Sequence, residues 1–303
     1  MENFIKKIDY EIKKDSNEVY HSKKEFISAS GLKLIKQSPL HFIEHEQTET
    51  DAMFFGSAYH TFILENELFE SEYFVFDETN ILDILKGEGS QKPRGTNKYK
   101  EWYNEQMNEA AGKIMIELPM YNLLKSMRNR LMKHKYVKSL FSDGEAEMSV
   151  YCELEIFTGQ KLKVKIRPDY MKQKKHIISD LKTCVSASTI DFPRHAADFD
   201  YHIQAALYHD IMSAVEGKGF GWFFFFIAQE KTKPFAFNIF ESSPQFLGQG
   251  RYEYEALLQL YAYCQENNTW PGYQCFTENR FGVNELNLPP YFVREINWFN
   301  HKF

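Results

Sequence analysis

The residues best placed to do chemistry are Asp169, which follows an Arg-Pro pair, and Asp180 and Lys182, which flank Leu181. On a β-strand, residues two apart face the same way, so Asp180 and Lys182 would project together while Leu181 points into the core. A hairpin turn near Lys174 would bring Asp169 beside Asp180. Two carboxylates can hold a hard divalent cation, with the ammonium group beside it. The pattern therefore predicts the minimal apparatus for metal-assisted hydrolysis of a phosphodiester.

These short motifs also occur by chance, and a charge pair on a strand is more often a solvated face. Four further residues strengthen the metal-site interpretation. Gln204 and Tyr208 lie one turn apart on one face of a predicted helix, although ordinary packing has the same spacing. His60 ends a Gly-Ser-Ala-Tyr-His stretch; imidazole is a competent metal ligand, but a lone helical histidine is more often structural. Glu147 begins the preceding strand and is either a third carboxylate of the site or an exposed edge charge.

The elements that would position these residues change in kind along the chain. We expect a single domain in which residues 1–140 are mostly helical, 141–267 form the core, and 268–303 are a C-terminal extension. The sequence predicts an α/β fold with a central mixed β-sheet flanked by helices and an N-terminal helical elaboration. The expected helices are 28–35, one beginning at 39, 51–64, 99–116, 119–140, 197–216 and 244–265; the expected strands are 146–157, 161–171, 176–183, 220–228 and 234–240; residues 86–100 are expected to be a mobile loop.

Composition limits the classes of function. The 303 residues are 43% hydrophobic and 16% aromatic, enough for a substantial core. A formal net charge of -6 argues against binding nucleic acid by bulk attraction, so any DNA contact must be confined to a groove or channel. The N-terminus lacks a signal peptide's apolar core, and the longest apolar run, 222–228, is too short to span a bilayer, so we expect a cytoplasmic protein with no membrane partner.

Basic residues occur in two places where a DNA contact could form. One group surrounds the predicted hairpin and the other lies on a predicted helix, where a solvated helix face is the simpler interpretation. The expected DNA-binding residues of the hairpin are Lys163, Lys165, Arg167, Lys172 and Lys174, and the helical group is Lys125, Arg128, Arg130, Lys133, Lys135 and Lys138.

The four cysteines contain no C-x-x-C pair, which argues against a zinc knuckle or a disulfide framework. We expect buried free thiols at Cys152, Cys184, Cys264 and Cys275.

Taken in order, several stretches resemble the RecE-type exonucleases (exodeoxyribonuclease VIII-like), relatives of the lambda-type exonucleases and RecB nuclease domains within the PD-(D/E)XK superfamily. The resemblance covers roughly residues 28–240 and implies the PD-(D/E)XK, or restriction-endonuclease-like, fold. One departure from the general pattern is that the second acidic position is Asp180 and not glutamate. RecE-like members share this aspartate. The stretches are SASGLK at 28–33, GSAYH at 56–60, AEMS at 146–149, RPD at 167–169, DLKT at 180–183 and YHIQAALY at 201–208.

The resemblance implies a role for each matching residue. His60, Asp169, Asp180 and the Leu181 carbonyl would bind metal, with Glu147 as an additional acidic ligand or a supporting group. Lys182 would orient or activate the attacking water. The metal would be Mg²⁺, with Mn²⁺ able to substitute. Gln204 and Tyr208 match a Q-x-x-x-Y motif that in such nucleases supports the site and the DNA strand end.

The resemblance also implies a substrate and partners. The expected activity is digestion of linear double-stranded DNA from its ends, 5′ to 3′, leaving a 3′ overhang for a RecT-like single-strand annealing protein in homologous recombination. Because RecE-like enzymes form toroids, a homo-oligomeric ring is expected.

Three alternatives stay open at this point. The fold could serve a repair or defence endonuclease, or a catalytically silent DNA-binding or assembly module. An unrelated enzyme could use Cys184, which shares the strand face of Lys182, as a nucleophile, although inert packing is the default interpretation of such a cysteine.

Overall fold

Two β-sheets form the centre of the protein in a computed structural model that describes residues 4–46, 48–217, 221–273, 283 and 285–288. The first sheet is antiparallel, in the order β1 (Ile5–Lys14), β5 (Met148–Ile156), β6 (Lys161–Ile166). The second has the order β10 (Phe237–Glu241), β9 (Phe223–Glu230), β8 (Ile177–Cys184), β7 (Tyr170–Lys172), β4 (Glu145–Ala146). Only β8 and β9 are parallel in this sheet, so the predicted mixed sheet is confirmed.

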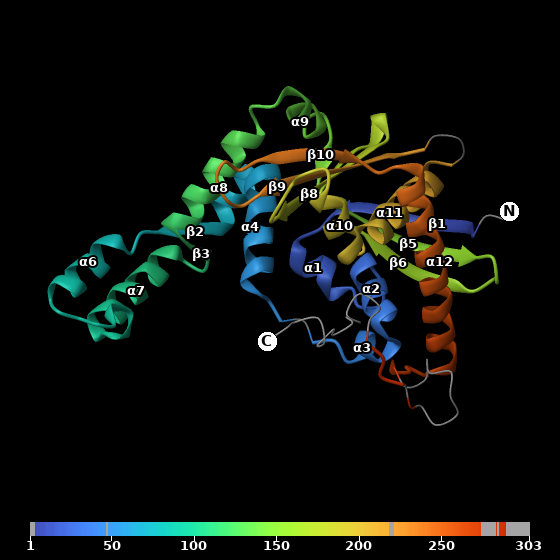
Figure 1. Ribbon diagram of the computed structural model, residues 1–303, viewed down its shortest axis with the longest axis horizontal. Helices are drawn as coiled ribbons and strands as arrows, with labels where there is room; N and C mark the ends of the chain where they lie inside the picture. The colour runs from blue at the N-terminus through green and yellow to red at the C-terminus, as the bar shows by residue number, and fades with distance from the viewer. Residues whose placement is uncertain (1–3, 47, 218–220, 274–282, 284, 289–303) are drawn as a thin grey trace, which may run out of the picture.

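Helices cover the sheets and form a projecting arm (Figure 1). No helix of the described residues is long and apolar enough to cross a membrane. The helices are α1 (Asn17–Ser22), α2 (Ala29–Gln37), α3 (Pro39–Ile43), α4 (Asp51–Leu64), α5 (Asn66–Glu72), α6 (Thr79–Gly87), α7 (Asn97–Ala110), α8 (Leu118–Leu131), α9 (Lys135–Leu140), α10 (Asp191–Asp198), α11 (Tyr201–Glu216) and α12 (Pro244–Asn267).

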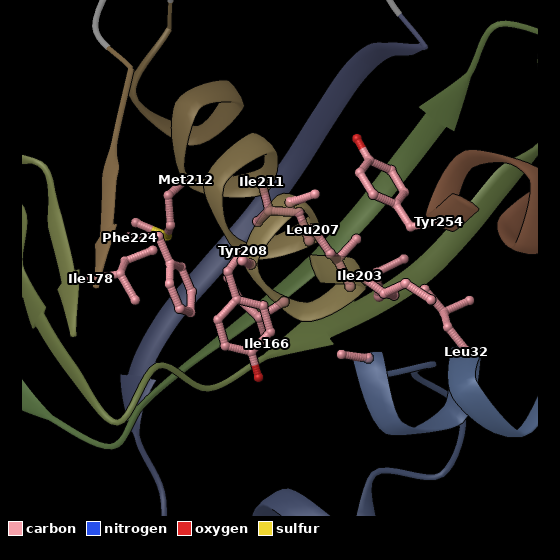
Figure 2. Close-up of a cluster of buried hydrophobic side chains, with 14 of the residues drawn as sticks. Leu32, Ile166, Ile178, Ile203, Leu207, Tyr208, Ile211, Met212, Phe224 and Tyr254 are labelled. Carbon is pink, nitrogen blue, oxygen red and sulfur yellow. The ribbon is translucent and has the colours of Figure 1, made fainter. Parts of the chain in front are cut away.

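Two apolar cores lie on opposite faces of the second sheet. Strand β9 alternates between them: Phe224 and Phe226 join the core beneath α11 and α12, while Phe225 and Ile227 join the core beneath α4 and α8. The first of these cores also takes in the strands of the first sheet, and Figure 2 shows part of it around Tyr208. The prediction of a strand covered on both faces is therefore confirmed for β9.

The chain crosses between the two sheets at two adjacent points. Between β6 and β7 it passes through Asp169, and between β4 and β5 through Glu147. The backbone N–H of Glu147 donates to the Asp169 carbonyl at 3.1 Å, which holds the crossings together. Glu147 has a φ of +53°, a left-handed conformation that costs a non-glycine residue energy unless the surroundings enforce it. Two acidic residues are thus brought to one corner by the topology.

The two helix starts that were predicted from N-cap serines are confirmed. Ser28 accepts from the N–H of Gly31 at the start of α2, and Ser243 accepts from that of Phe246 at the start of α12. The predicted helix at 51–64 coincides with α4. Side-chain capping fixes these boundaries locally, which is why the sequence suffices.

Several other boundaries were predicted wrongly in the first half of the chain. Strand β1 was missed, and so were β2 (Tyr73–Phe76) and β3 (Ile114–Glu117), which pair in parallel at the base of the arm. The expected loop at 86–100 is shorter, because α6 runs to Gly87 and Thr96 caps α7. Only a short 3₁₀ turn, Pro93–Gly95, lies between these helices.

Three long elements expected as continuous are instead divided. The predicted strand 161–171 is split into β6 and β7 by the crossing at Asp169, and the helix 119–140 into α8 and α9. The helix expected at 197–216 begins as a separate helix, α10, and is interrupted at Asp200, whose φ is +53°. The predicted C-terminal extension falls largely outside the described residues.

Candidate metal centre

Asp169 and Asp180 face each other across the predicted hairpin. Strands β7 and β8 pair antiparallel, with Tyr170 opposite Ser179, and the turn between them is a short 3₁₀ segment, Gln173–Lys175. The register therefore sets Asp169 beside Asp180, as the sequence predicts.

Side-chain direction on β8 also follows the predicted alternation. Lys182 reaches Asp180 on one side of the strand, while Leu181 packs into the core beneath α4. The carboxylate–lysine pair therefore faces the site and the leucine faces the core.

Each of the two aspartates is held by one hydrogen bond from a neighbour. The backbone N–H of Leu181 donates to Asp169 Oδ2 at 2.7 Å, and Gln204 Nε2 donates to Asp180 Oδ1 at 2.7 Å. Asp180 is fully buried, and its other oxygen, Oδ2, pairs with Lys182 Nζ at 2.5 Å. A buried carboxylate oxygen with only this contact has capacity left for another cation.

His60 and Glu147 approach the same point from other elements. His60 Nδ1, on α4, lies 3.5 Å from Asp169 Oδ2 and 3.9 Å from Glu147 Oε1. His60 Nε2 lies 3.1 Å from the Leu181 carbonyl oxygen, which can only accept a hydrogen bond. A proton on Nε2 therefore leaves Nδ1 facing two carboxylates as a third acceptor. Three acceptors that face one another repel, and either a proton or a metal ion bound among them would remove this repulsion.

Burial and mutual repulsion perturb the carboxylates strongly. Burial, followed by the charge of Asp169, raises the pKa of Asp180 to about 6. The same two causes raise the pKa of Glu147 well above its usual range. The site thus holds more negative charge than its own side chains neutralise.

Lys182 is held in its charged form. Burial alone would lower its pKa, but the charges of Asp180 and Asp169 outweigh burial and raise the pKa above the usual value. An ammonium group therefore stands beside the carboxylates at neutral pH.

The donor set fits a hard divalent cation. One ligand atom each of His60, Glu147 and Asp169 lies within 4.8 Å of the others, and the buried carboxylate of Asp180 interacts electrostatically with Asp169 and His60. Carboxylate and carbonyl oxygens with one imidazole suit Mg²⁺ or Mn²⁺. His60, Glu147, Asp169 and Asp180 would hold the ion, with the Leu181 carbonyl available at their side.

Sequence reasoning assigned no role to two neighbours of Lys182. Its Nζ lies 5.0 Å from the ring centre of Tyr201, and the Nζ of Lys33 lies 5.2 Å from the same centre. Burial and then the charge of Lys182 lower the pKa of Lys33 to about 8, and its Nζ donates to the Phe199 carbonyl. Both residues occur in stretches that carry the family resemblance, which was the available signal.

Tyr208 and Gln204, one turn apart on α11, do different things. Gln204 touches the site through Asp180, whereas Tyr208 is buried and its ring centre lies 6.2 Å from that of Phe224 (Figure 2). Burial raises the pKa of Tyr208 well above its usual range. Tyr208 thus packs against β9, and its support of the site and of a DNA strand end stays a prediction.

The predicted DNA-binding residues divide into two groups. Lys165 donates to the Tyr20 and Lys23 carbonyls, and Arg167 donates to Ser149 and the Asp15 carbonyl; both are buried. The N-terminal segment covers this end of the sheet, so the predicted phosphate contacts by these two residues are wrong.

Lys172 is also buried, and its Nζ donates to the Ser139 carbonyl, so its predicted DNA contact is wrong for the same reason. Lys163 and Lys174 are exposed, and DNA contact by them stays a prediction.

The cysteine expectations hold where the structure describes them. Cys152, Cys184 and Cys264 are buried and unpaired, while Cys275 lies outside the described residues. Burial raises the pKa of Cys184 to about 11, which keeps this thiol protonated at neutral pH and argues against its use as a nucleophile.

Comparisons with known proteins agree with the fold. A solved structure from Eubacterium rectale, provisionally described as an exonuclease, matches with a TM-score of 0.58 and 18% identity over 91% of this chain and 97% of that chain. The structure of SSO0001 matches with a TM-score of 0.28 and 15% identity over 75% of this chain and 84% of that chain, too weakly to bear on the fold. None of the curated proteins matches significantly.

The fold is that of the PD-(D/E)XK class. Residues 28–279 match the family model described as a PDDEXK-like domain of unknown function (DUF3799), and the chain belongs to this family.

Proposed function

We propose that the protein is a metal-dependent deoxyribonuclease that digests linear double-stranded DNA from its ends. The observation that carries the proposal is the convergence of His60, Glu147 and Asp169 next to the buried Asp180–Lys182 pair. A divalent cation would neutralise the excess negative charge of these carboxylates, and the protonated lysine beside them can offset the negative charge of a phosphodiester.

Magnesium is the proposed ion, with manganese as a substitute. When bound, it supplies Lewis-acid activation of water and neutralisation of phosphate charge. The residues around it orient these groups: Gln204 fixes Asp180, and the Leu181 N–H fixes Asp169. The ammonium of Lys182 is placed to stabilise negative charge that develops on the phosphate.

The finer activity rests on resemblance to the RecE-type exonucleases. It supports digestion from 5′ to 3′ with a 3′ overhang left for a RecT-like single-strand annealing protein in recombination. A homo-oligomeric ring and a cytoplasmic location belong to the same proposal. The provisional description of the Eubacterium rectale protein as an exonuclease is consistent with it.

The test compares end-labelled linear duplex, covalently closed circular DNA and single strands, each with Mg²⁺ and with a chelator. We expect Mg²⁺-dependent loss of the linear duplex, with a label at the 5′ end released before one at the 3′ end, and an intact circle. Cleavage of the circle would replace this proposal with an endonuclease. Binding of DNA without any cleavage, in either metal, would indicate a silent module.

A further inference from the structure

A cavity separate from the metal centre is lined by residues of α4, α5, β2 and α8. Figure 1 shows α4, β2 and α8 near the base of the arm. The volume of the cavity is about 450 Å³, within the usual range of small-molecule sites. It shares no residue with the metal centre. Phe62 of the cavity and His60 of the metal centre are two apart on α4, and a helical rotation of about 200° separates them. The cavity therefore lies on another side of that helix.

Four aromatic rings build the cavity. The ring centres of Phe62 and Phe69 are 4.8 Å apart, those of Phe69 and Tyr73 are 4.4 Å apart, and those of Phe62 and Tyr121 are 5.7 Å apart. Phe62, Phe69 and Tyr73 are buried, whereas Tyr121 is only half-buried. The cavity thus has a continuous aromatic lining with one accessible ring, the kind of surface on which a planar ligand stacks.

Two cations of α8, Lys125 and Arg128, line the same cavity. Lys125 Nζ lies 5.3 Å from the ring centre of Tyr121, and Arg128 Cζ lies 5.7 Å from that of Phe62. Within the described part of the chain, neither charged group forms an ion pair with a carboxylate. Arg128 Nε is buried and has no hydrogen-bond partner. A solvated helix face would explain Lys125 but not a guanidinium nitrogen closed off from water.

These features define the chemistry of a ligand. The cavity lining also includes one carboxylate, Glu70, which accepts a hydrogen bond from Asn66 Nδ2 at 3.0 Å, so the two cations leave one positive charge in excess. That excess calls for an anion, the rings call for a flat aromatic group, and the side-chain amide of Asn129, which also lines the cavity, calls for a hydrogen-bonding edge. A nucleotide has all three parts. We propose that this cavity binds a nucleotide unit, with its phosphate at Lys125 and Arg128 and its base against Tyr121.

The nucleotide has two possible sources, a free mononucleotide or an unpaired nucleotide of a DNA strand. The second source rests on the proposed function, because a nuclease acting on duplex ends brings such a strand to this protein. Both sources share the same recognition chemistry, so one binding experiment can separate them.

The experiment measures binding of a short fluorescein-labelled oligodeoxyadenylate to the full chain in a chelator, where hydrolysis is excluded. Unlabelled oligodeoxyadenylate, dAMP, inorganic phosphate and an abasic strand are each tested as competitors of the labelled strand. The test variant combines Lys125→Gln with Arg128→Gln. The matched control combines Arg130→Gln with Lys133→Gln, which removes the same charge from exposed positions nearby that do not line the cavity. The single variant Lys125→Gln changes an exposed side chain and covers the case in which loss of Arg128 disturbs folding.

We expect the test variant to weaken binding about tenfold or more and the control about twofold or less. Tyr121→Leu should weaken binding of the strand about fivefold or more without affecting the abasic strand. Displacement by dAMP identifies a free nucleotide as a ligand, and displacement by unlabelled oligodeoxyadenylate but not by dAMP or the abasic strand identifies the DNA strand.

Other outcomes overturn the proposal. Equal weakening by the test and control variants would mean bulk attraction to a positive helix, and equal binding of phosphate or the abasic strand would mean a simple anion site. Binding that is abolished in Asp169→Asn but kept in the test variant would belong to the metal centre. Hydrolysis is scored separately: binding without cleavage rejects the nuclease and keeps the nucleotide site, and cleavage with unchanged binding does the reverse.

Discussion

Two groups of carboxylates around a histidine lie in different parts of this protein. One is His60, Glu147 and Asp169; the other is Asp200, His202 and Glu253, and in both groups the ligand atoms lie within 4.8 Å of one another. By residue type and distance alone, each is a candidate for a metal ion. They differ in what already neutralises them.

The second group is already satisfied by its neighbours. Lys36 Nζ lies 2.6 Å from both Asp200 Oδ1 and Glu253 Oε2, and Gln249 and His202 contact the other oxygen of Glu253. Burial raises the pKa of Glu253, but these hydrogen bonds outweigh it and lower the pKa below its usual range. Lys36 therefore offsets one of the two negative charges, and hydrogen bonds stabilise the carboxylate of Glu253.

The first group shows the opposite state. Although Lys182 pairs with Asp180 beside this group, the pKa values of Asp180 and Glu147 are both raised, whereas that of Glu253 is lowered. Ligand distance alone does not separate the two groups, but the direction of these pKa shifts does. We therefore expect the first group, and not the second, to bind a divalent cation.

The largest difference in activity should appear between two variants that each remove one carboxylate, one at the first group and one at the second. Asp180→Asn should lower Mg²⁺-dependent DNA hydrolysis by about 10³-fold, because the group that helps to hold the ion and Lys182 is removed. Glu253→Gln, the matched control in the second group, should leave the rate within about twofold. Initial rates on a labelled linear duplex measure both. Comparable losses in the two variants would erase the distinction between the groups.

The next effect is on stability and depends on pH. The pKa of Asp180 is raised from its usual 3.8 to about 6, so the folded protein binds this proton more tightly than the unfolded chain. Without metal, stability from this group is therefore lost as pH rises from 3.8 to about 6. A divalent cation competes with the proton, so it should stabilise the fold more at about pH 8 than at about pH 5.

Thermal unfolding with and without Mg²⁺ or Ca²⁺ measures this effect. At about 100 times its Kd the ion should contribute about 3 kcal/mol at the higher pH. Asp169→Asn should remove the stabilisation and Glu253→Gln should keep it. An equal rise in Tm at both pH values would contradict the assigned role of Asp180.

A smaller effect on stability should follow from removing the lysine that pairs with the carboxylates of the second group. Lys36→Gln removes both short contacts to Asp200 and Glu253, and because Lys36 is itself partly exposed the loss should be about 1 kcal/mol. In an Asp169→Asn background, the same change should create a stabilisation by Ca²⁺ that Asp169→Asn alone lacks. Lys24→Gln, at an exposed position, is the control. Absence of any Ca²⁺ response would show that uncompensated charge is insufficient to make a site.

The sequence predicts elements whose boundaries are local. Caps and a proline mark α2, α4 and α12, and strand alternation places Asp180 and Lys182 together. The breaks at Glu147 and Asp200 were missed, because both take a left-handed conformation that is accompanied by distant contacts. The Glu147 N–H bonds to Asp169, and Asp200 pairs with Lys36. Such contacts have no local signal.

The same reasoning explains what the sequence showed of the site. Hairpin spacing was sufficient for Asp169 and Asp180, whereas His60 comes from a remote helix and only family resemblance indicated it. The alternating strand at 162–167 predicted outward-facing basic residues, but the N-terminal segment that pairs alongside Val164 at Ile27 covers Lys165 and Arg167 and leaves only Lys163 exposed. Periodicity describes one strand and does not say what will pack on it.

The smallest expected effect is on DNA affinity, and it distinguishes exposed lysines from a lysine that is hydrogen-bonded within the protein. Lys163 and Lys174 are exposed, whereas Lys165 is satisfied by two backbone carbonyls. Lys163→Gln with Lys174→Gln should weaken duplex binding by a few fold in Ca²⁺ and reduce the slope of log affinity against log salt by about 2, one unit for each phosphate that the variant no longer neutralises. Lys165→Met should instead lower Tm, because it strands the Tyr20 and Lys23 carbonyls, and leave the salt slope unchanged. If Lys165→Met alters the salt slope and the double variant of Lys163 and Lys174 does not, then Lys165, and not the exposed lysines, contacts the DNA phosphates.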